Sequence, residues 1–183
     1  MSKIGVSKFH YAKQTREDTA SDAAQYETPV AVPGLVSVNV ETTSNTATLY
    51  ADNGPYETAS SLGDVNLTVN LADLPLQVQA DLLGHELTTG GQLDSKASDV
   101  APYVAVMFEF LLGNGKKRCV KLYKGKFTEP ADAGNTRGEN VEFQTSEATA
   151  AFVQLKNNAM YKSVQDFDAD ASTDSWYAAV LPA

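Results

Sequence analysis

The chain offers few side chains that can titrate or attack a substrate near neutral pH. Its histidines are His10 and His85, and its one cysteine is Cys119. General acid–base catalysis, nucleophilic catalysis and zinc binding each need several such groups at matched spacings, and none is present. We expect both histidines to be structural or solvated. Cys119, which Arg118 and Lys121 would activate if it were exposed, is expected to be an inert thiol. No catalytic residue, cofactor or metal is expected.

Three further patterns fail as sites. Residues 113–117 (GNGKK) look like a phosphate loop, but the residues that follow favour a strand and not the helix that a phosphate cradle needs. The acidic run 166–175 offers alternate oxygen ligands, yet Ala171 and Tyr177 stand where a calcium loop needs glycine and glutamate. A solvated acidic tail is the better interpretation. No spacing pairs Glu109 with a second carboxylate for hydrolysis.

The basic residues gather in one short segment. The segment is 116–126, and the residues of interest in it are Lys116, Lys117, Arg118 and Lys121. Because the formal net charge of the chain is −9, a nucleic-acid-binding face is disfavoured. We interpret these four residues as a basic contact patch for an acidic surface on a neighbouring protein.

Length and composition indicate an ordinary globular protein. A chain of 183 residues favours a single domain over 1–183, and 43% hydrophobic with 20% charged residues argues against disorder. The lone cysteine excludes an internal disulfide. The first residues lack the apolar region of a signal peptide, and no stretch reaches the length of a membrane span. We therefore expect synthesis in a cytoplasm and no membrane partner.

Period-two alternation is the main structural signal, and it predicts strands with one buried face. It occurs at 36–41 and 65–71. Residues 102–112 are apolar at nearly every position, which predicts a strand covered on both faces. Gly113-Asn114-Gly115 then predicts a hairpin turn into 118–124. Further strands are expected at 3–12, 28–33, 139–145 and 148–156.

A single helix is expected over 75–83. Pro75 suits the first helical turn and Gly84 suits the end. The face that would cover one end of a sheet consists of Leu76, Ala80 and Leu83.

Two stretches are expected to be irregular. Residues 42–62 combine small polar side chains with the turn signal Asp52-Asn53-Gly54-Pro55, and 129–140 is a second polar loop. A connection as long as 42–62 is either functional or a self-packed surface loop.

Several stretches carry a resemblance to a known family. They are 2–12, 47–63, 71–85, 101–130 and 138–145, and the most specific are TLYADNGPYE and LADLPLQVQADLLGH. In these the chain resembles the major tail proteins of siphophages, the long non-contractile-tailed phages, in the branch typical of Gram-positive hosts. Residues 157–183, a C-terminal arm, match less clearly.

The resemblance implies a mainly β, antiparallel sandwich or barrel-like tail-tube fold with one flanking helix. It implies hexameric rings that stack with a tape-measure protein into the tail tube of a virion, through which genomic DNA passes without specific binding. It also makes the long loop a subunit contact. The contact residues are Tyr50, Asp52, Asn53, Gly54, Pro55, Tyr56 and Glu57.

The sequence thus favours a self-associating, non-enzymatic structural subunit. The alternative is a β-sandwich carbohydrate-binding or adhesin-like module. Such a module needs an exposed aromatic platform, and Trp176 with Tyr177 is the adjacent aromatic pair that would supply one.

Overall fold

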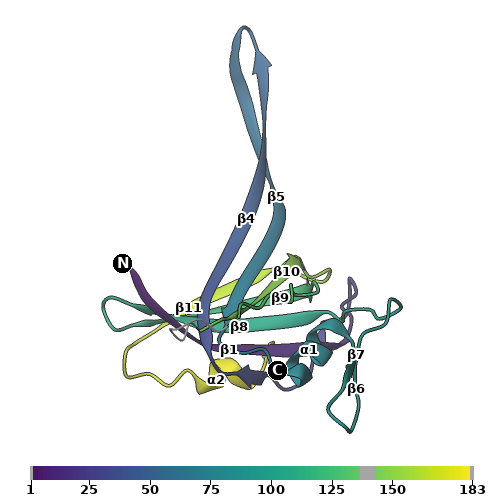
Figure 1. Ribbon diagram of the computed structural model, residues 1–183. Helices are drawn as coiled ribbons and strands as arrows, with labels where there is room; N and C mark the ends of the chain where they lie inside the picture. The colour runs from purple at the N-terminus through teal and green to yellow at the C-terminus, as the bar shows by residue number, and fades with distance from the viewer. Residues whose placement is uncertain (1, 137–142, 182–183) are drawn as a thin grey trace.

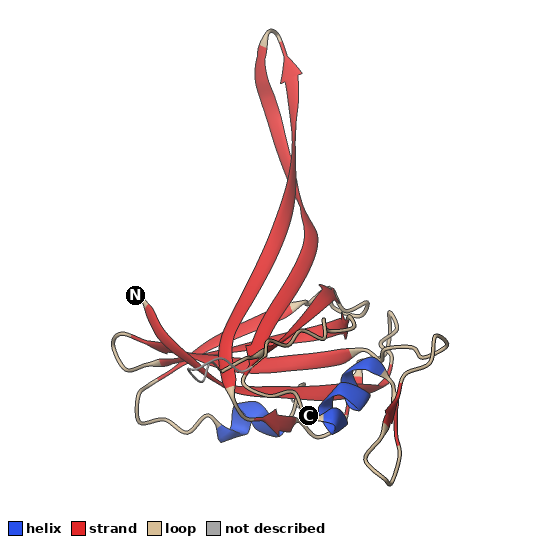
Figure 2. Cartoon of the chain, viewed as in Figure 1, coloured by secondary structure: helices blue, strands red, loops and turns tan. Residues whose placement is uncertain are grey.

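The chain folds mainly into β-strands, as the alternating segments predict (Figure 1, Figure 2). The computed structural model describes residues 2–136 and 143–181. The strands are β1 (Lys3–Arg16), β2 (Gln25–Tyr26), β3 (Val30–Val32), β4 (Leu35–Ala51), β5 (Gly54–Leu71), β6 (Glu86–Leu87), β7 (Leu93–Asp94), β8 (Val104–Leu112), β9 (Lys117–Phe127), β10 (Ser146–Val153) and β11 (Lys162–Phe167). The helices are α1 (Leu76–Leu83) and α2 (Asp174–Ala178).

Within the described residues, nine strands form one branched antiparallel sheet. Its order is β2-β1-β8-β9-β10-β5-β4, with β3 paired to β1 and β11 paired to β9. One branch lies in β9, where residues 117–122 pair with β11 and residues 124–127 pair with β10. The other lies in β1, where residues 9–11 pair with β3 and residues 14–16 pair with β2. The sheet is sandwich-like and does not close into a barrel, which confirms the predicted mainly β, antiparallel class.

The core lies on both sides of β8, as the apolar run at 102–112 predicts. Val104, Val106 and Phe108 pack in a large cluster with side chains of β1, β5, β9, β10 and α1. Ala105 and Met107 point the other way, into a smaller cluster that the C-terminal segment completes. Burial of both faces requires cover from two separate parts of the chain.

The predicted hairpin after β8 is confirmed. Leu111 pairs with Lys117, and Gly115 in the turn has φ of 82°, a value that favours glycine. The strands expected at 3–12, 28–33 and 148–156 are also present, as β1, β3 and β10. Of the strand expected at 139–145, residues 139–142 lie outside the described residues, and 143–145 are not in a strand.

Helix α1 forms where it is predicted, but its buried face is different. Pro75 directly precedes the helix, and Gly84 ends it with φ of 77°. The buried residues are Val78, Ala80, Leu82 and Leu83. The prediction that Leu76 shares this face is wrong: Leu76 is 46% exposed, and Val78 is the buried residue of the first turn. No helix in the described part of the chain is long and apolar enough to cross a membrane.

The end of α1 generates a test of close packing. A Cβ atom on Gly84 would lie 2.5 Å from the carbonyl oxygen of Val100, whereas one on Gly91, with φ of 82°, would meet no atom within 4 Å. We expect Gly84→Ala to lower the free energy of unfolding by about 2–4 kcal/mol, because backbone strain and a clash add together. Gly91→Ala introduces backbone strain without a clash, so urea unfolding should show a loss of only about 1–2 kcal/mol in the free energy of unfolding. Equal losses would contradict this packing.

His85, just beyond α1, bridges two acidic side chains. Its Nδ1 lies 2.8 Å from Asp99 Oδ2 and its Nε2 lies 3.0 Å from Glu129 Oε2. Both ring nitrogens can donate together only in the imidazolium form. Hydrogen bonding to Asp99, then to Glu129, accordingly raises the pKa of His85 above its ordinary value.

The raised pKa of His85 predicts a pH dependence of stability. The contribution is fully present below the unfolded-state pKa of about 6.5 and is lost as the pH rises through the folded-state pKa. We expect the difference in unfolding free energy between wild type and His85→Gln, measured in urea, to shrink from pH 6 to pH 9. A difference that is constant over this range would show that the charge on His85 does not matter.

Candidate assembly surface

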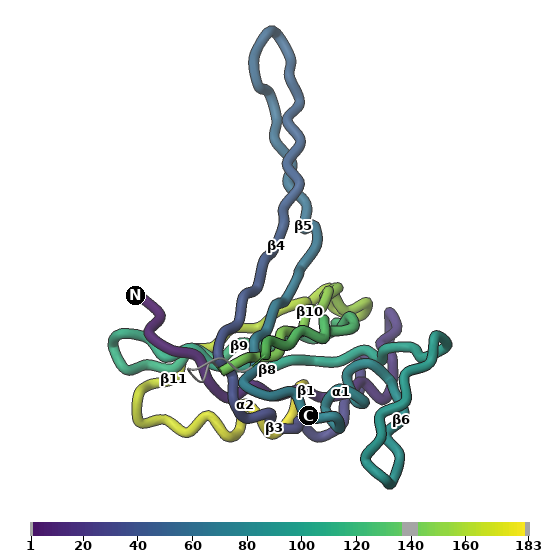
Figure 3. The backbone as a smooth tube through the Cα atoms, viewed as in Figure 1, coloured from purple at the N-terminus to yellow at the C-terminus, as the bar shows by residue number. Residues whose placement is uncertain are grey.

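The most exposed element of the molecule is the β4–β5 hairpin, which rises far from the body (Figure 1, Figure 3). Its inner half belongs to the core, because Val65, Leu67, Val69 and Leu71 are fully buried. In its outer half, over residues 41–64, every side chain is exposed or half-buried. The outer half is therefore a two-stranded ribbon with nothing of its own chain on either face.

The boundary between the buried inner half and the exposed outer half of the hairpin coincides with an irregularity in strand pairing. Thr42 pairs with Val65 and Ser44 with Leu62, so one strand has an extra residue between these pairs. Gly63 lies there, and a Cβ on it would come 2.5 Å from Thr43 Oγ1. Such a bulge bends and twists a strand, which directs the ribbon away from the sheet.

The expectation of an irregular loop at 42–62 is wrong, because these residues continue both strands. Serine, threonine and alanine alternate there without an apolar face, so the periodic signal of a strand is missing. The turn signal itself is correct. Asp52 and Asn53 have φ of 50° and 63°, the left-handed values of a two-residue hairpin turn. The structure thus brings all seven expected contact residues together at the tip.

The tip combines large apolar side chains with negative charge. Leu49, Tyr50 and Tyr56 are 57%, 71% and 74% exposed. Asp52 and Glu57 lie among them, and residues 35–71 contain no lysine or arginine. Exposed apolar side chains gathered in this way mark interaction surfaces.

The basic contact patch is occupied by the chain's own C-terminal segment. Arg118 donates from Nε and Nη2 to Asp166, each at 2.7 Å, and Lys116 Nζ lies 2.8 Å from Asp168 Oδ1. Lys117 Nζ donates to the carbonyl oxygen of Ala171. The prediction that these cations meet a neighbouring protein stays a prediction.

Lys121 departs furthest from that prediction, because it is buried. Its Nζ donates to the carbonyl oxygens of Ala179 and Val180, at 2.7 and 3.2 Å, and lies 4.4 Å from the centre of the Trp176 ring. The solvated acidic tail expected at 166–175 is correct only in part. Most of its side chains are exposed, but β11 extends to Phe167 and a second helix, α2, starts at Asp174. Asp166 and Asp168 pair with Arg118 and Lys116.

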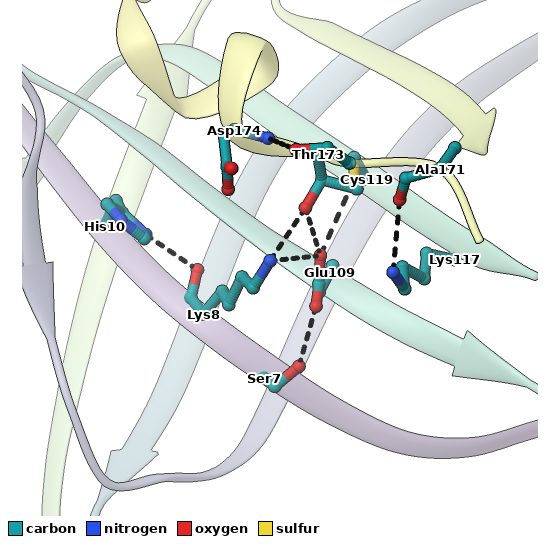
Figure 4. Close-up of polar contacts among 10 residues, drawn as sticks. Ser7, Lys8, His10, Glu109, Lys117, Cys119, Ala171, Thr173 and Asp174 are labelled. Carbon is teal, nitrogen blue, oxygen red and sulfur yellow. Dashed lines mark hydrogen bonds and ion pairs between the residues drawn. The ribbon is translucent and has the colours of Figure 1, made fainter. Parts of the chain in front are cut away.

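A polar cluster fastens the C-terminal segment to the sheet (Figure 4). Glu109 is buried, and its carboxylate accepts hydrogen bonds from Ser7 Oγ at 3.1 Å and Thr173 Oγ1 at 3.2 Å. Lys8 Nζ lies 3.7 Å from the same carboxylate and donates to Thr173 Oγ1 at 2.8 Å. Cys119 is fully buried beside them, and burial raises the pKa of its thiol to about 11. The arrangement binds a segment of the chain itself and holds the thiol protonated.

The aromatic platform that a carbohydrate-binding module needs does not form. Tyr177 is buried and stacks on His10, with ring centres 4.4 Å apart. Trp176 is half-buried, with Phe167 against its edge. Within the described residues, no three histidine, cysteine or carboxylate side chains are placed to hold a metal ion.

One buried ion pair is not anticipated by the sequence analysis. Lys124 is 2% exposed, and its Nζ donates to Asp18 Oδ1 at 2.7 Å and to Glu17 Oε1 at 3.0 Å. The signal was available in part, because Lys124 directly follows the apolar residues Leu122 and Tyr123 in the predicted strand 118–124. A lysine within a buried strand requires a buried partner. Its face could not be predicted, because the pairing of β8 with β9 is irregular there.

Removal of that partner should be strongly destabilising. Asp18→Asn removes the buried counter-charge of Lys124 and leaves it only the more exposed Glu17, so we expect the unfolding free energy to fall by up to about 3–5 kcal/mol. The matched control is Asp168→Asn, which breaks the exposed pair with Lys116 and should cost less than about 1 kcal/mol. Chemical denaturation of both variants measures the difference. Similar losses would mean that Lys124 reaches solvent.

Taken together, fold and surface define an antiparallel, sandwich-like β-protein that extends a bare hairpin. Its fold is similar to that of a chain in the cryo-electron microscopy structure of the anti-feeding prophage cap, the tube-terminating cap. The TM-score is 0.51 at 11% sequence identity, and the match covers 87% of this chain and 88% of that one. At this identity the likeness establishes a shared fold. No protein-family model and no curated protein sequence matches the chain.

Proposed function

We propose that this chain is a structural, non-enzymatic subunit of a phage-type tail tube, with residues 1–183 acting as one domain. Its copies form hexameric rings that stack with a tape-measure protein. The finished tube is part of the virion and lets genomic DNA pass during delivery.

The bare outer half of the β4–β5 hairpin is the observation that carries this proposal. A two-stranded ribbon alone is marginally stable in water, and here more than twenty residues, 41–64, have no cover on either face. An uncovered strand edge also invites pairing with another chain. Association with further subunits supplies both the cover and the pairing.

Two further observations support the same function. The fold is shared with a chain from the structure of a tube-terminating cap. The net charge of −9 suits a conduit, since a negative wall repels phosphate groups and gains nothing from counterion release.

The same likeness favours a second candidate, a cap at the end of a tube in place of the tube itself. Negative-stain microscopy of concentrated purified protein separates the two. Tubes with a central channel support the tube subunit, and single closed rings support the cap. Monomers at every salt concentration would contradict both.

Removal of the outer hairpin should separate folding from assembly. We expect a variant in which Asn-Gly replaces residues 44–62 to keep its unfolding free energy within about 1 kcal/mol of wild type, because none of the removed side chains is buried. The same variant should form no tubes or rings. Tubes of normal length would contradict a role for the hairpin, and loss of the folded state would contradict the division into two halves.

A further inference from the structure

A half-open cavity of about 670 Å³ lies between β9, β11 and the C-terminal segment. Apolar side chains supply most of its wall. Those that matter here are Met160, Phe167, Trp176 and Val180. A cavity of this size is in the range of sites that hold large apolar groups.

The charge of the cavity is equally distinctive. Lys121 is the one charged residue among its described lining residues, and no carboxylate lines it. The Lys121 ammonium group is held in place by the carbonyl oxygens of Ala179 and Val180. A negatively charged segment can therefore enter without meeting a like charge.

The hairpin tip has the complementary chemistry. It presents Leu49, Tyr50 and Tyr56 to solvent, with Asp52 and Glu57 between them. Each tyrosine can bury roughly 150–250 Å² in a suitable pocket. The apolar side chains and the negative charge of the tip thus complement the apolar wall and the positive charge of the cavity.

The tip cannot reach the cavity of its own subunit. Val65 is the buried residue of β5 nearest to the tip. From Val65 to Gly54 at the turn is eleven residues, or about 36 Å of extended strand. Figure 3 shows that this length leads away from the body of the chain. The occupant must come from a second copy.

We propose that the cavity between β9, β11 and the C-terminal segment receives the hairpin tip of a second copy of this chain. The inference rests on the proposed function, since both require copies to associate. It adds where the hairpin binds: tyrosine rings enter the apolar part of the cavity, and Asp52 and Glu57 lie toward Lys121.

Disulfide trapping between two differently labelled chains tests the contact. One chain carries Tyr56→Cys and the other carries Gln165→Cys, at an exposed residue that lines the cavity. The control chain carries Val164→Cys. Val164 directly precedes Gln165 in β11, is 49% exposed and does not line the cavity. Cys119 is buried in every chain. We expect the first pair to cross-link at least about tenfold faster than the control pair, because docking raises the local thiol concentration.

A second pair of variants probes the charge and shape of the cavity. Met160→Asp should raise the protein concentration needed for assembly about tenfold or more, because it places a carboxylate opposite Asp52 and Glu57. Met160→Leu keeps the apolar wall and should assemble as wild type does. If Met160→Asp forms normal tubes and both cysteine pairs cross-link at the same rate, the docking site is ruled out and the proposed function is left intact. Failure of the unmodified chain to associate at all would overturn both.

Discussion

Burial of β8 on both faces is the constraint on which the rest of the structure depends. One face is covered by the strands and helix that share the large cluster, and the other is covered by the C-terminal segment. The C-terminal segment covers a face that contains polar side chains, because β8 and β9 carry Glu109, Lys121 and Lys124 on that side. Each therefore needs a partner from the chain itself. The hydroxyl groups of Ser7 and Thr173, the carbonyl groups near residue 180 and the carboxylate of Asp18 meet that need.

The same need for partners explains why the basic contact patch is already paired within the chain. Free cations on β9 would need hydration beside a hydrophobic cluster, whereas Asp166 and Asp168 neutralise them at the surface. The C-terminal segment is thus a structural cover that carries its own counter-charges. Its packing leaves a cavity beside Trp176 because a strand and a short helix of five residues do not fill the space that they enclose.

The sequence predicts those elements whose signal is local. The strand at 102–112, its glycine-rich turn and the helix that ends at Gly84 follow from apolar runs and backbone-permissive residues. The outer hairpin could not be recognised as strand, because a ribbon with two bare faces has no apolar periodicity to detect. The partners Thr173 of Glu109 and Asp18 of Lys124 could not be assigned either, since they lie 64 and 106 positions away in the sequence. At the candidate surface, the sequence predicts the turn at Asp52 and Asn53 correctly but not the length of the strands that lead to it. The contact role of its seven residues stays a prediction.

The uneven distribution of charge links the core to assembly. Within the described residues, most cations of the body are paired with acids of the body, and no ion pair involves the acids of the hairpin, from Glu41 to Asp64. Two hairpins repel each other, so association of tip with tip is disfavoured, and a neutral or cationic acceptor is favoured instead. Repulsion between exposed charges weakens with salt over about 10 Å, whereas burial of leucine and tyrosine does not depend on that screening. In the proposed assembly, the acidity that keeps single subunits apart would therefore also select which surface a hairpin occupies.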